Sequence, residues 1–189
     1  MDFYQEIPFL VEQLQQGELI LYPTDTIWGI GCDATNIDAI HQIDVVKQRA
    51  IGKHYVLLMD SYDMLEEYIA YIPLKARNLI DYHSRPLTIV YDEPLGLPKE
   101  ILAGDGSIAI RITKDPFCQE VIQSFGKPIV STSANISGQP FPTCFADIDM
   151  QIKTAIKGIA KHRQQETVTA VPSTIVKVEE GKDLIFIRK

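Results

Sequence analysis

The chain has 189 residues, of which 46% are hydrophobic and 23% are charged, and its formal net charge is −7. These values predict one soluble globular domain over residues 1–189, and the acidic balance argues against a protein that coats nucleic acid by bulk charge. No apolar run approaches the roughly 18 residues that span a bilayer. The acidic N-terminal segment, residues 1–18, is unlike a signal peptide, so we expect a cytoplasmic protein without membrane contact.

Hydrophobic spacing predicts helices and strands that alternate along the chain, beginning with an amphipathic helix at residues 3–16. The other predicted helices cover residues 37–49, begin near 62 and 73, and cover 116–125 and 145–162. The predicted strands cover residues 19–22, 55–59, 87–91, 108–112, 128–131, 173–178 and 184–188. Asn36, Ser61 and Asp115 are the expected N-caps, and Gly126 is an expected helix stop.

Alternation of this kind is typical of the α/β class. The last two predicted strands flank residues 179–182, which have the composition of a hairpin turn and indicate a mixed sheet. Residues 93–106 are expected to form a long surface loop.

Cysteine and histidine spacing does not indicate a metal centre. The three cysteines, Cys32, Cys118 and Cys144, are far apart and none belongs to a C-x-x-C pair, which argues against a zinc site and a disulfide framework. The four histidines share no motif. We therefore expect inert thiols and no protein metal site.

A run of small polar side chains, STSANISG at residues 131–138, follows the predicted strand at 128–131. Ligands of open α/β sheets bind beyond the carboxyl ends of strands, and small hydroxyls let an anion or a sugar approach the backbone closely. The alternative is a polar turn whose Ser and Asn side chains bond to their own backbone.

A second polar stretch, PTDT at residues 23–26, places two hydroxyls beside a carboxylate after a predicted strand. A capping turn is the alternative interpretation. Gly29, Gly31 and Ala34 match the dinucleotide pattern G-x-G-x-x-A, but the strand before them ends too early and no clear ribose-binding acid follows. We discount this match.

Cations gather near the end of one predicted helix, where Lys47, Arg49 and Lys53 fall within seven residues. They fit either a phosphate clamp or a favourable interaction with the helix C-terminus. Arg111 lies inside an apolar predicted strand, where a charge needs a partner or a ligand. The chain contains no G-x-x-x-x-G-K-[ST] motif, so a nucleotide is not expected in a P-loop.

Five segments, taken in order, resemble the YrdC-like family, the threonylcarbamoyl-AMP synthases. They are PTDTIWGI at 23–30, KQRAIGK at 47–53, IAIR at 108–111, STSANISG at 131–138 and PSTI at 172–175. The resemblance implies a twisted mixed sheet with flanking helices around a central cavity, in the short, single-domain form. Arg85 departs from the family pattern at a usual glycine, and Lys177 departs at a usual aspartate.

The resemblance implies a nucleotidyltransferase that converts L-threonine, bicarbonate or CO2 and ATP into threonylcarbamoyl-AMP and pyrophosphate. Such a reaction depends on positioning and charge neutralisation more than on a covalent nucleophile. Mg2+ is expected to arrive with ATP. The product would supply a transferase complex that modifies an adenosine of tRNA, and the resemblance also implies a weak contact of this chain with tRNA.

The same resemblance implies roles for individual residues. The catalytic pair would be Lys47 and Arg49. Threonine would be held by Thr26, Ser107, Arg111, Ser131 and Ser173. ATP would be held by Arg49, Lys53, Ser133, Asn135 and Arg188.

Two other interpretations compete with this one. A paralogue of the same fold could bind RNA or a nucleotide without catalysis, and a carbamoyl-transfer domain of a hydrogenase-maturation protein would share the fold. The acidic total weakens the first, and the intact cationic and hydroxyl-rich segments favour the enzyme. No segment resembles the zinc-finger or acylphosphatase modules that accompany the second.

Overall fold

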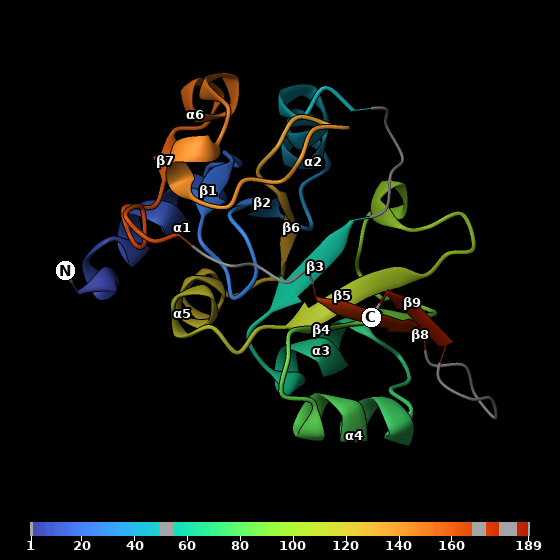
Figure 1. Ribbon diagram of the computed structural model, residues 1–189. Coiled ribbons are helices and arrows are strands. Elements are labelled where there is room, and N and C mark those ends of the chain that lie inside the picture. Colours follow the sequence, from blue (N-terminus) through green and yellow to red (C-terminus); the bar gives the residue numbers. More distant parts are fainter. Residues whose placement is uncertain (1, 50–54, 168–172, 178–184, 189) are drawn as a thin grey trace.

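A computed structural model describes residues 2–49, 55–167, 173–177 and 185–188. Within those residues, nine strands form one sheet in the spatial order β7-β1-β2-β6-β3-β5-β4-β8-β9 (Figure 1). The strands are β1 Ile20–Tyr22, β2 Gly29–Asp33, β3 Val56–Met59, β4 Leu87–Tyr91, β5 Ile108–Ile112, β6 Ile129–Ser133, β7 Gly158–Ile159, β8 Thr174–Lys177 and β9 Ile185–Arg188.

The sheet is mixed. β1 pairs in parallel with β7, β3 with β5 and β4 with β8, whereas the other neighbouring pairs are antiparallel. The antiparallel pairing of β8 with β9 confirms the predicted terminal strand pair, although its turn lies outside the described residues. The predicted α/β class with a twisted mixed sheet and flanking helices is therefore confirmed (Figure 1).

Helices cover both sides of the sheet. They are α1 Ile7–Gln15, α2 Ile37–Val46, α3 Tyr62–Tyr68, α4 Leu74–Tyr82, α5 Pro116–Phe125 and α6 Met150–Ala155. α1 packs against β1 and α5, and in Figure 1 α3 and α4 lie towards β3, β4 and β5. No helix among the described residues is long and apolar enough to cross a membrane.

Local capping explains where several helices begin. The Asn36 side chain accepts hydrogen bonds from two backbone N–H groups of α2, and Ser61 and Asp115 cap α3 and α5 in the same manner. Gly126 ends α5 at φ 77°, a left-handed conformation that suits glycine. These four predictions are confirmed, although α2 ends at Val46, before the predicted boundary.

The single helix predicted at residues 145–162 is wrong. The segment forms a 3-10 turn at Phe145–Asp147, then α6, then β7. A Cβ on Gly158 would lie 2.9 Å from the carbonyl oxygen of Leu19, so the close pairing of β7 with β1 requires a glycine there. Strand pairing therefore overrides the helical periodicity at the end of this segment.

The region around β2 also needs correction. Sequence patterns do not predict β2, because Gly29 and Gly31 lower its strand propensity. A Cβ on Gly31 would lie 2.8 Å from the ring of Tyr22, so this glycine lets the tyrosine ring lie across the strand. The glycines belong to a strand and not to a dinucleotide-binding turn. The predicted strand at 128–131 extends to Ser133 as β6, so the first hydroxyls of STSANISG lie within the strand.

The first predicted helix is also divided, since a 3-10 turn at Phe3–Gln5 precedes α1. The loop at 93–106 contains a short 3-10 turn at Lys99–Ile101. Cys32, Cys118 and Cys144 are free thiols, the first two of them buried.

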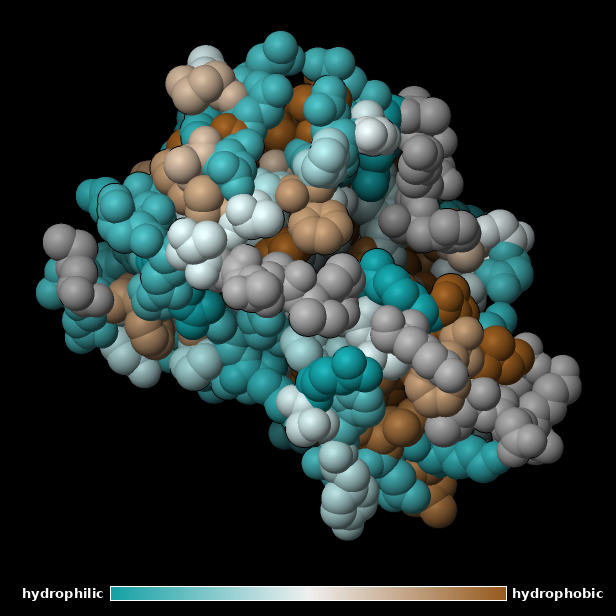
Figure 2. All heavy atoms as spheres, in the orientation of Figure 1, coloured by the Kyte–Doolittle hydropathy of each residue, from teal (hydrophilic) through white to brown (hydrophobic). Residues whose placement is uncertain are grey.

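Large apolar side chains fill the interior, and Leu10, Trp28 and Phe117 are at most 2% exposed. The visible surface is mostly hydrophilic, with apolar side chains gathered near β8 and β9 (Figure 2). There Ile185 and Ile187 of β9 are 45% and 58% exposed.

Candidate active site

A cavity of about 270 Å3 lies against one face of the sheet, where residues from distant segments meet. Side chains alternate between the faces of a strand, so Arg111 points towards this cavity while Ile110 and Ile112 point away from it. The cavity brings together six of the residues for which the sequence predicts a binding role. These are Thr26, Ser131, Ser133, Arg111, Ser173 and Arg188.

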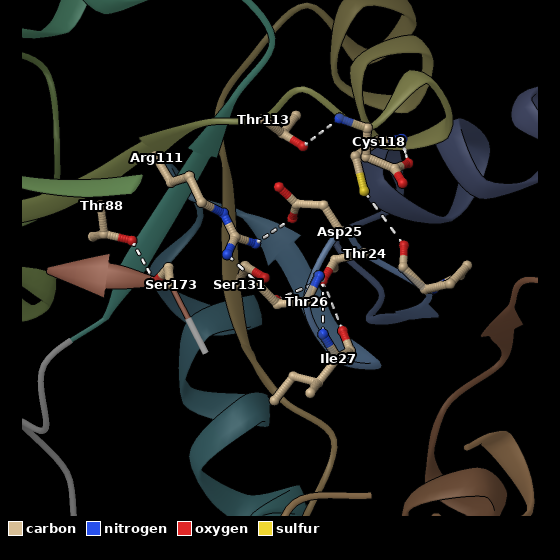
Figure 3. Close-up of polar contacts among 12 residues, drawn as sticks. Thr24, Asp25, Thr26, Ile27, Thr88, Arg111, Thr113, Cys118, Ser131 and Ser173 are labelled. Atoms are coloured by element: carbon tan, nitrogen blue, oxygen red, sulfur yellow. Dashed lines mark hydrogen bonds and ion pairs between the residues drawn. The ribbon is translucent and has the colours of Figure 1, made fainter. Parts of the chain in front are cut away.

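Arg111 supplies the buried positive charge of the cavity. Its side chain is 7% exposed, and its Nη2 lies 3.2 Å from Oδ1 of Asp25. Nη1 donates to the Thr26 hydroxyl at 3.3 Å, and the close-up in Figure 3 shows the guanidinium group directed at both residues. Arg111 Nε is buried and has no hydrogen-bond partner among the described residues. The arrangement holds the guanidinium in place and leaves a donor for an anionic ligand.

Asp25 is the counter-ion that orients Arg111, and the sequence assigned it no role. Burial raises the pKa of its carboxyl group, and the neighbouring Arg111 charge opposes that shift. The PTDT stretch signals a carboxylate, but the partner lies on β5, far along the chain.

Three hydrogen bonds between hydroxyl groups fix side chains around the cavity. Thr24 and Thr26 share a hydrogen bond of 2.9 Å between their hydroxyls, and Tyr22 donates to Ser131 Oγ at 2.8 Å. Thr88 and Ser173 share another of 2.9 Å (Figure 3). Fixed hydroxyls lose little freedom when a ligand binds, so these groups suit the recognition of a small polar molecule.

Arg188 and Ser133 complete the wall. Arg188 Nε donates to the Ser173 carbonyl at 2.9 Å, and its Nη2 donates to the Ser173 hydroxyl at 3.1 Å. Burial, aided by the charge of Arg111, lowers the pKa of Arg188. Two guanidinium groups therefore face one small cavity, which favours an anionic ligand in an otherwise acidic protein.

Lys47 does not line this cavity, because its ammonium group holds the polar segment that follows β6. It donates to the carbonyl oxygens of Ser133 and Asn135, the latter at 2.8 Å. The Lys47 carbonyl in turn accepts from the backbone N–H of Ser137 at 2.8 Å. Burial, with a smaller effect of the Arg49 charge, lowers the pKa of Lys47 to about 8.

Arg49 is held near the same place by Asp44 and Tyr55. Its Nε lies 2.5 Å from Asp44 Oδ1, and its guanidinium carbon lies 4.3 Å from the centre of the Tyr55 ring. Arg49 Nη2 is buried without a hydrogen-bond partner among the described residues, so one donor remains for a ligand. Like Asp25, Asp44 holds an arginine of the site, and the sequence did not indicate this role. Lys53, the third predicted cation, lies outside the described residues.

Asn135 and Ser107 occupy positions beside the cavity. The Asn135 amide donates to the carbonyls of Ile136 and Gln139, which supports a loop-shaping role, and its buried Oδ1 has no partner within the described segments. Ser107 lines an adjoining, largely apolar cavity of about 520 Å3 and donates to Asp105 at 2.6 Å. Its predicted contact with threonine stays a prediction.

The two departures from the family pattern fall outside the first cavity. Lys177 lines the adjoining cavity, where its ammonium lies 3.1 Å from Asp105 and 3.4 Å from Asp92. Arg85 lines a separate cavity on the other side of the sheet. An effect of Arg85 on the wall of the first cavity is therefore not supported.

The described residues contain no group of three or more His, Cys, Asp or Glu side chains that could hold a metal ion. The polar groups of the first cavity are mainly hydroxyls and guanidinium groups, which bind anions better than cations.

Comparison with known proteins gives one consistent set of relatives. A profile of the Sua5/YciO/YrdC family, described as telomere recombination, matches residues 12–189. A threonylcarbamoyl-AMP synthase of Vibrio parahaemolyticus is 34% identical over 178 residues, which cover 93% of this chain and 94% of that protein. The synthase of Pseudoalteromonas translucida is 39% identical over 147 residues, covering 76% and 78%.

Solved structures share the fold. P. abyssi Sua5 complexed with L-threonine superposes with a TM-score of 0.88 and 26% identity over the whole of this chain. This chain spans 54% of the length of that Sua5. E. coli YciO superposes with a TM-score of 0.84 over 98% of this chain and 89% of its own, at 20% identity, which supports the fold alone.

Proposed function

The chain belongs to the Sua5/YciO/YrdC family, and from this premise we propose that it is a threonylcarbamoyl-AMP synthase. It is a transferase that joins L-threonine, bicarbonate or CO2, and ATP, and releases pyrophosphate. The observation that carries the proposal is that Arg111 and several fixed hydroxyl groups line the same cavity. A Sua5 relative with a closely similar fold is known in complex with L-threonine.

Threonine binds with its carboxylate on Arg111, whose Nε has no partner within the described structure. The hydroxyls of Thr26, Ser131 and Ser173 contact the polar groups of the amino acid. Burial of the cavity strengthens the charge pair between ligand and guanidinium. Because Asp25 and Thr26 already orient Arg111, little reorganisation accompanies binding.

The reaction proceeds in two bond-forming steps. The threonine amine attacks CO2 and loses a proton, which gives a carbamate. A carbamate oxygen then attacks the α-phosphorus of ATP. The bond between that phosphorus and the oxygen that bridges to the β-phosphate breaks, and pyrophosphate leaves with that oxygen. The protein contributes mainly position and positive charge in such a phosphoryl transfer.

Arg49, Lys53, Ser133, Asn135 and Arg188 form the proposed ATP site. The free Nη2 of Arg49 is the donor proposed to reach a phosphate. Lys47 acts by holding the carbonyls of Ser133 and Asn135, and so shapes the backbone that the nucleotide meets. Mg2+ would be carried by the triphosphate, where it would neutralise phosphate charge.

The product is a reactive acyl adenylate, which requires a partner that accepts the threonylcarbamoyl group. We propose that this partner is the tRNA threonylcarbamoyl-transferase complex, acting on a tRNA adenosine. A weak contact of this chain with tRNA and its cytoplasmic location stay predictions. The net charge of −7 favours a partner that binds the tRNA itself.

The non-catalytic alternative is not favoured, because the curated relatives are named as synthases. The test is incubation of the purified protein with ATP, Mg2+, bicarbonate and L-threonine. Mass spectrometry should detect threonylcarbamoyl-AMP, and pyrophosphate release should require both threonine and bicarbonate. Nucleotide binding without product would support the non-catalytic alternative instead.

A further inference from the structure

A second cavity of about 300 Å3 lies on the opposite face of the sheet from the first cavity, the one proposed to bind threonine. Its apolar wall comes from β4, β5 and α4, and includes Ile80, Ile89, Ile110 and Ile112. On β5, Arg111 alternates with Ile110 and Ile112 and lines the first cavity, and on β4 Thr88 precedes Ile89 and shares a hydrogen bond with Ser173 of that cavity. The two cavities are therefore separated by the sheet. The size is at the lower end of the range for small-molecule sites.

The rim of the second cavity is ordered by contacts between two loops. Lys114 Nζ donates to the His83 carbonyl at 2.9 Å, which joins the segment after β5 to the segment after α4. The His83 ring nitrogen Nδ1 lies 2.9 Å from the Arg85 carbonyl, so the loop carrying Arg85 is itself braced. Lys114 and Arg85 thus stand at one rim.

The charges around this cavity are unequally compensated. Asp25 is paired with Arg111 at 3.2 Å, and Asp115 is paired with Arg163 at 2.5 Å. Within the described residues, in contrast, the Lys114 ammonium contacts only a neutral carbonyl, and the Arg85 guanidinium has no hydrogen bond or ion pair. Each acid therefore has an arginine counter-ion that does not line this cavity, whereas the two rim cations have no counter-ion among the described residues. The positive charges of Arg85 and Lys114 therefore favour the binding of an anion at the rim.

We propose that this cavity is a second binding site, for a small carboxylate with an apolar body. The carboxylate would lie at the rim between Arg85 and Lys114, because a guanidinium group pairs with a planar carboxylate through two parallel N–H donors. The apolar body would lie against the isoleucine-rich wall. The proposal does not rest on the threonine-binding function proposed for the first cavity, although Asp25 lines the second cavity and pairs with Arg111 of the first.

The test uses phenylacetate as the probe and its uncharged amide, phenylacetamide, as the control. Four isoleucines line the cavity, so methyl NMR of protein labelled at isoleucine reports on it directly. Phenylacetate should shift the Ile80, Ile89, Ile110 and Ile112 methyl signals saturably, and the amide should bind at least about tenfold more weakly. Saturating L-threonine should leave the phenylacetate shifts in place.

Two variants test the rim. Arg85→Gly and Lys114→Gln should each raise the dissociation constant of phenylacetate at least about tenfold. Lys153→Gln is the matched control, since Lys153 also donates to a backbone carbonyl but lies on α6. The unperturbed isoleucine spectrum of each variant would establish that it is folded.

Several results would overturn the proposal. They are the absence of saturable shifts in these methyl groups, equal binding of acid and amide, and competitive displacement by threonine. Tighter binding of phenyl phosphate than of phenylacetate would overturn the carboxylate assignment. Product formation by the enzyme plays no part in this test, so failure of the proposed function would not be mistaken for failure of the second site.

Discussion

Arg111 in the hydroxyl-lined cavity and Lys47 at the end of α2 are both buried cations, but different groups hold their charges. Arg111 pairs with one carboxylate and one hydroxyl, and its Nε faces no protein acceptor in the described structure. Lys47 donates to two backbone carbonyls, one at the last residue of β6 and one in the segment that follows it. The first charge is prepared for a ligand, whereas the second is used to shape backbone. A cation within a motif can therefore serve a substrate without touching it.

The largest expected effect comes from Arg49. Its guanidinium group is held by Asp44, and its Nη2 has no hydrogen-bond partner among the described residues. Arg49→Ala should reduce adenylate formation by about 1000-fold or more, the range for arginines that stabilise phosphoryl transfer. The removal of Arg49 would also leave Asp44 charged and buried. The double variant Arg49→Ala/Asp44→Asn therefore carries the test, and Asp44→Asn alone is its control. Rates of pyrophosphate release near the unaltered value in the double variant would remove Arg49 from the phosphate site.

The next effect concerns Arg111. Arg111→Gln should weaken threonine binding by about 30-fold or more, as expected when one partner of a buried charge pair is lost. The unpaired Asp25 should also lower the free energy of unfolding. Adding Asp25→Asn should restore much of that stability but none of the threonine binding. Recovery of binding along with stability would show that Arg111 is only structural.

The smallest effect is a pH dependence at Lys47. Its folded pKa of about 8 is below its ordinary value of 10.5, so the unfolded chain binds more protons between these two pH values. The free energy of unfolding relative to Lys47→Met should therefore rise from pH 8 to pH 10, by at most about 1.4 kcal/mol per pH unit. Denaturant titrations at several pH values measure it. The exposed Lys157→Met variant is the control, and a flat difference would contradict a desolvated Lys47.

Local features of the fold could be predicted because the signal and its consequence lie close together in sequence. Asp115 and Gly126 mark the two ends of α5 through hydrogen bonds within a few residues, and both positions are confirmed. Gly158 shows the opposite case, since its strand pairing depends on β1, far away in the chain. Periodicity alone then favours a helix that tertiary contacts prevent.

In the site, too, the sequence indicates local residue types but not contacts between distant residues. The residue types at Thr26, Arg111 and Ser131 indicate polar recognition, and the structure places all three in one cavity. Asp25 and the carbonyl partners of Lys47 could not be assigned, because a sequence shows charges but not the distant groups that neutralise them.

The central claim is that the hydroxyl-lined cavity binds L-threonine, and calorimetric titration of threonine into Ser131→Leu tests it most directly. The added side chain would enter the cavity that Ser131 lines. Ser137→Leu places the same change in the same segment but outside that lining, and is the matched control. We predict saturable binding to the unaltered protein and to Ser137→Leu, and no binding to a folded Ser131→Leu. Unchanged threonine affinity in Ser131→Leu would contradict the account.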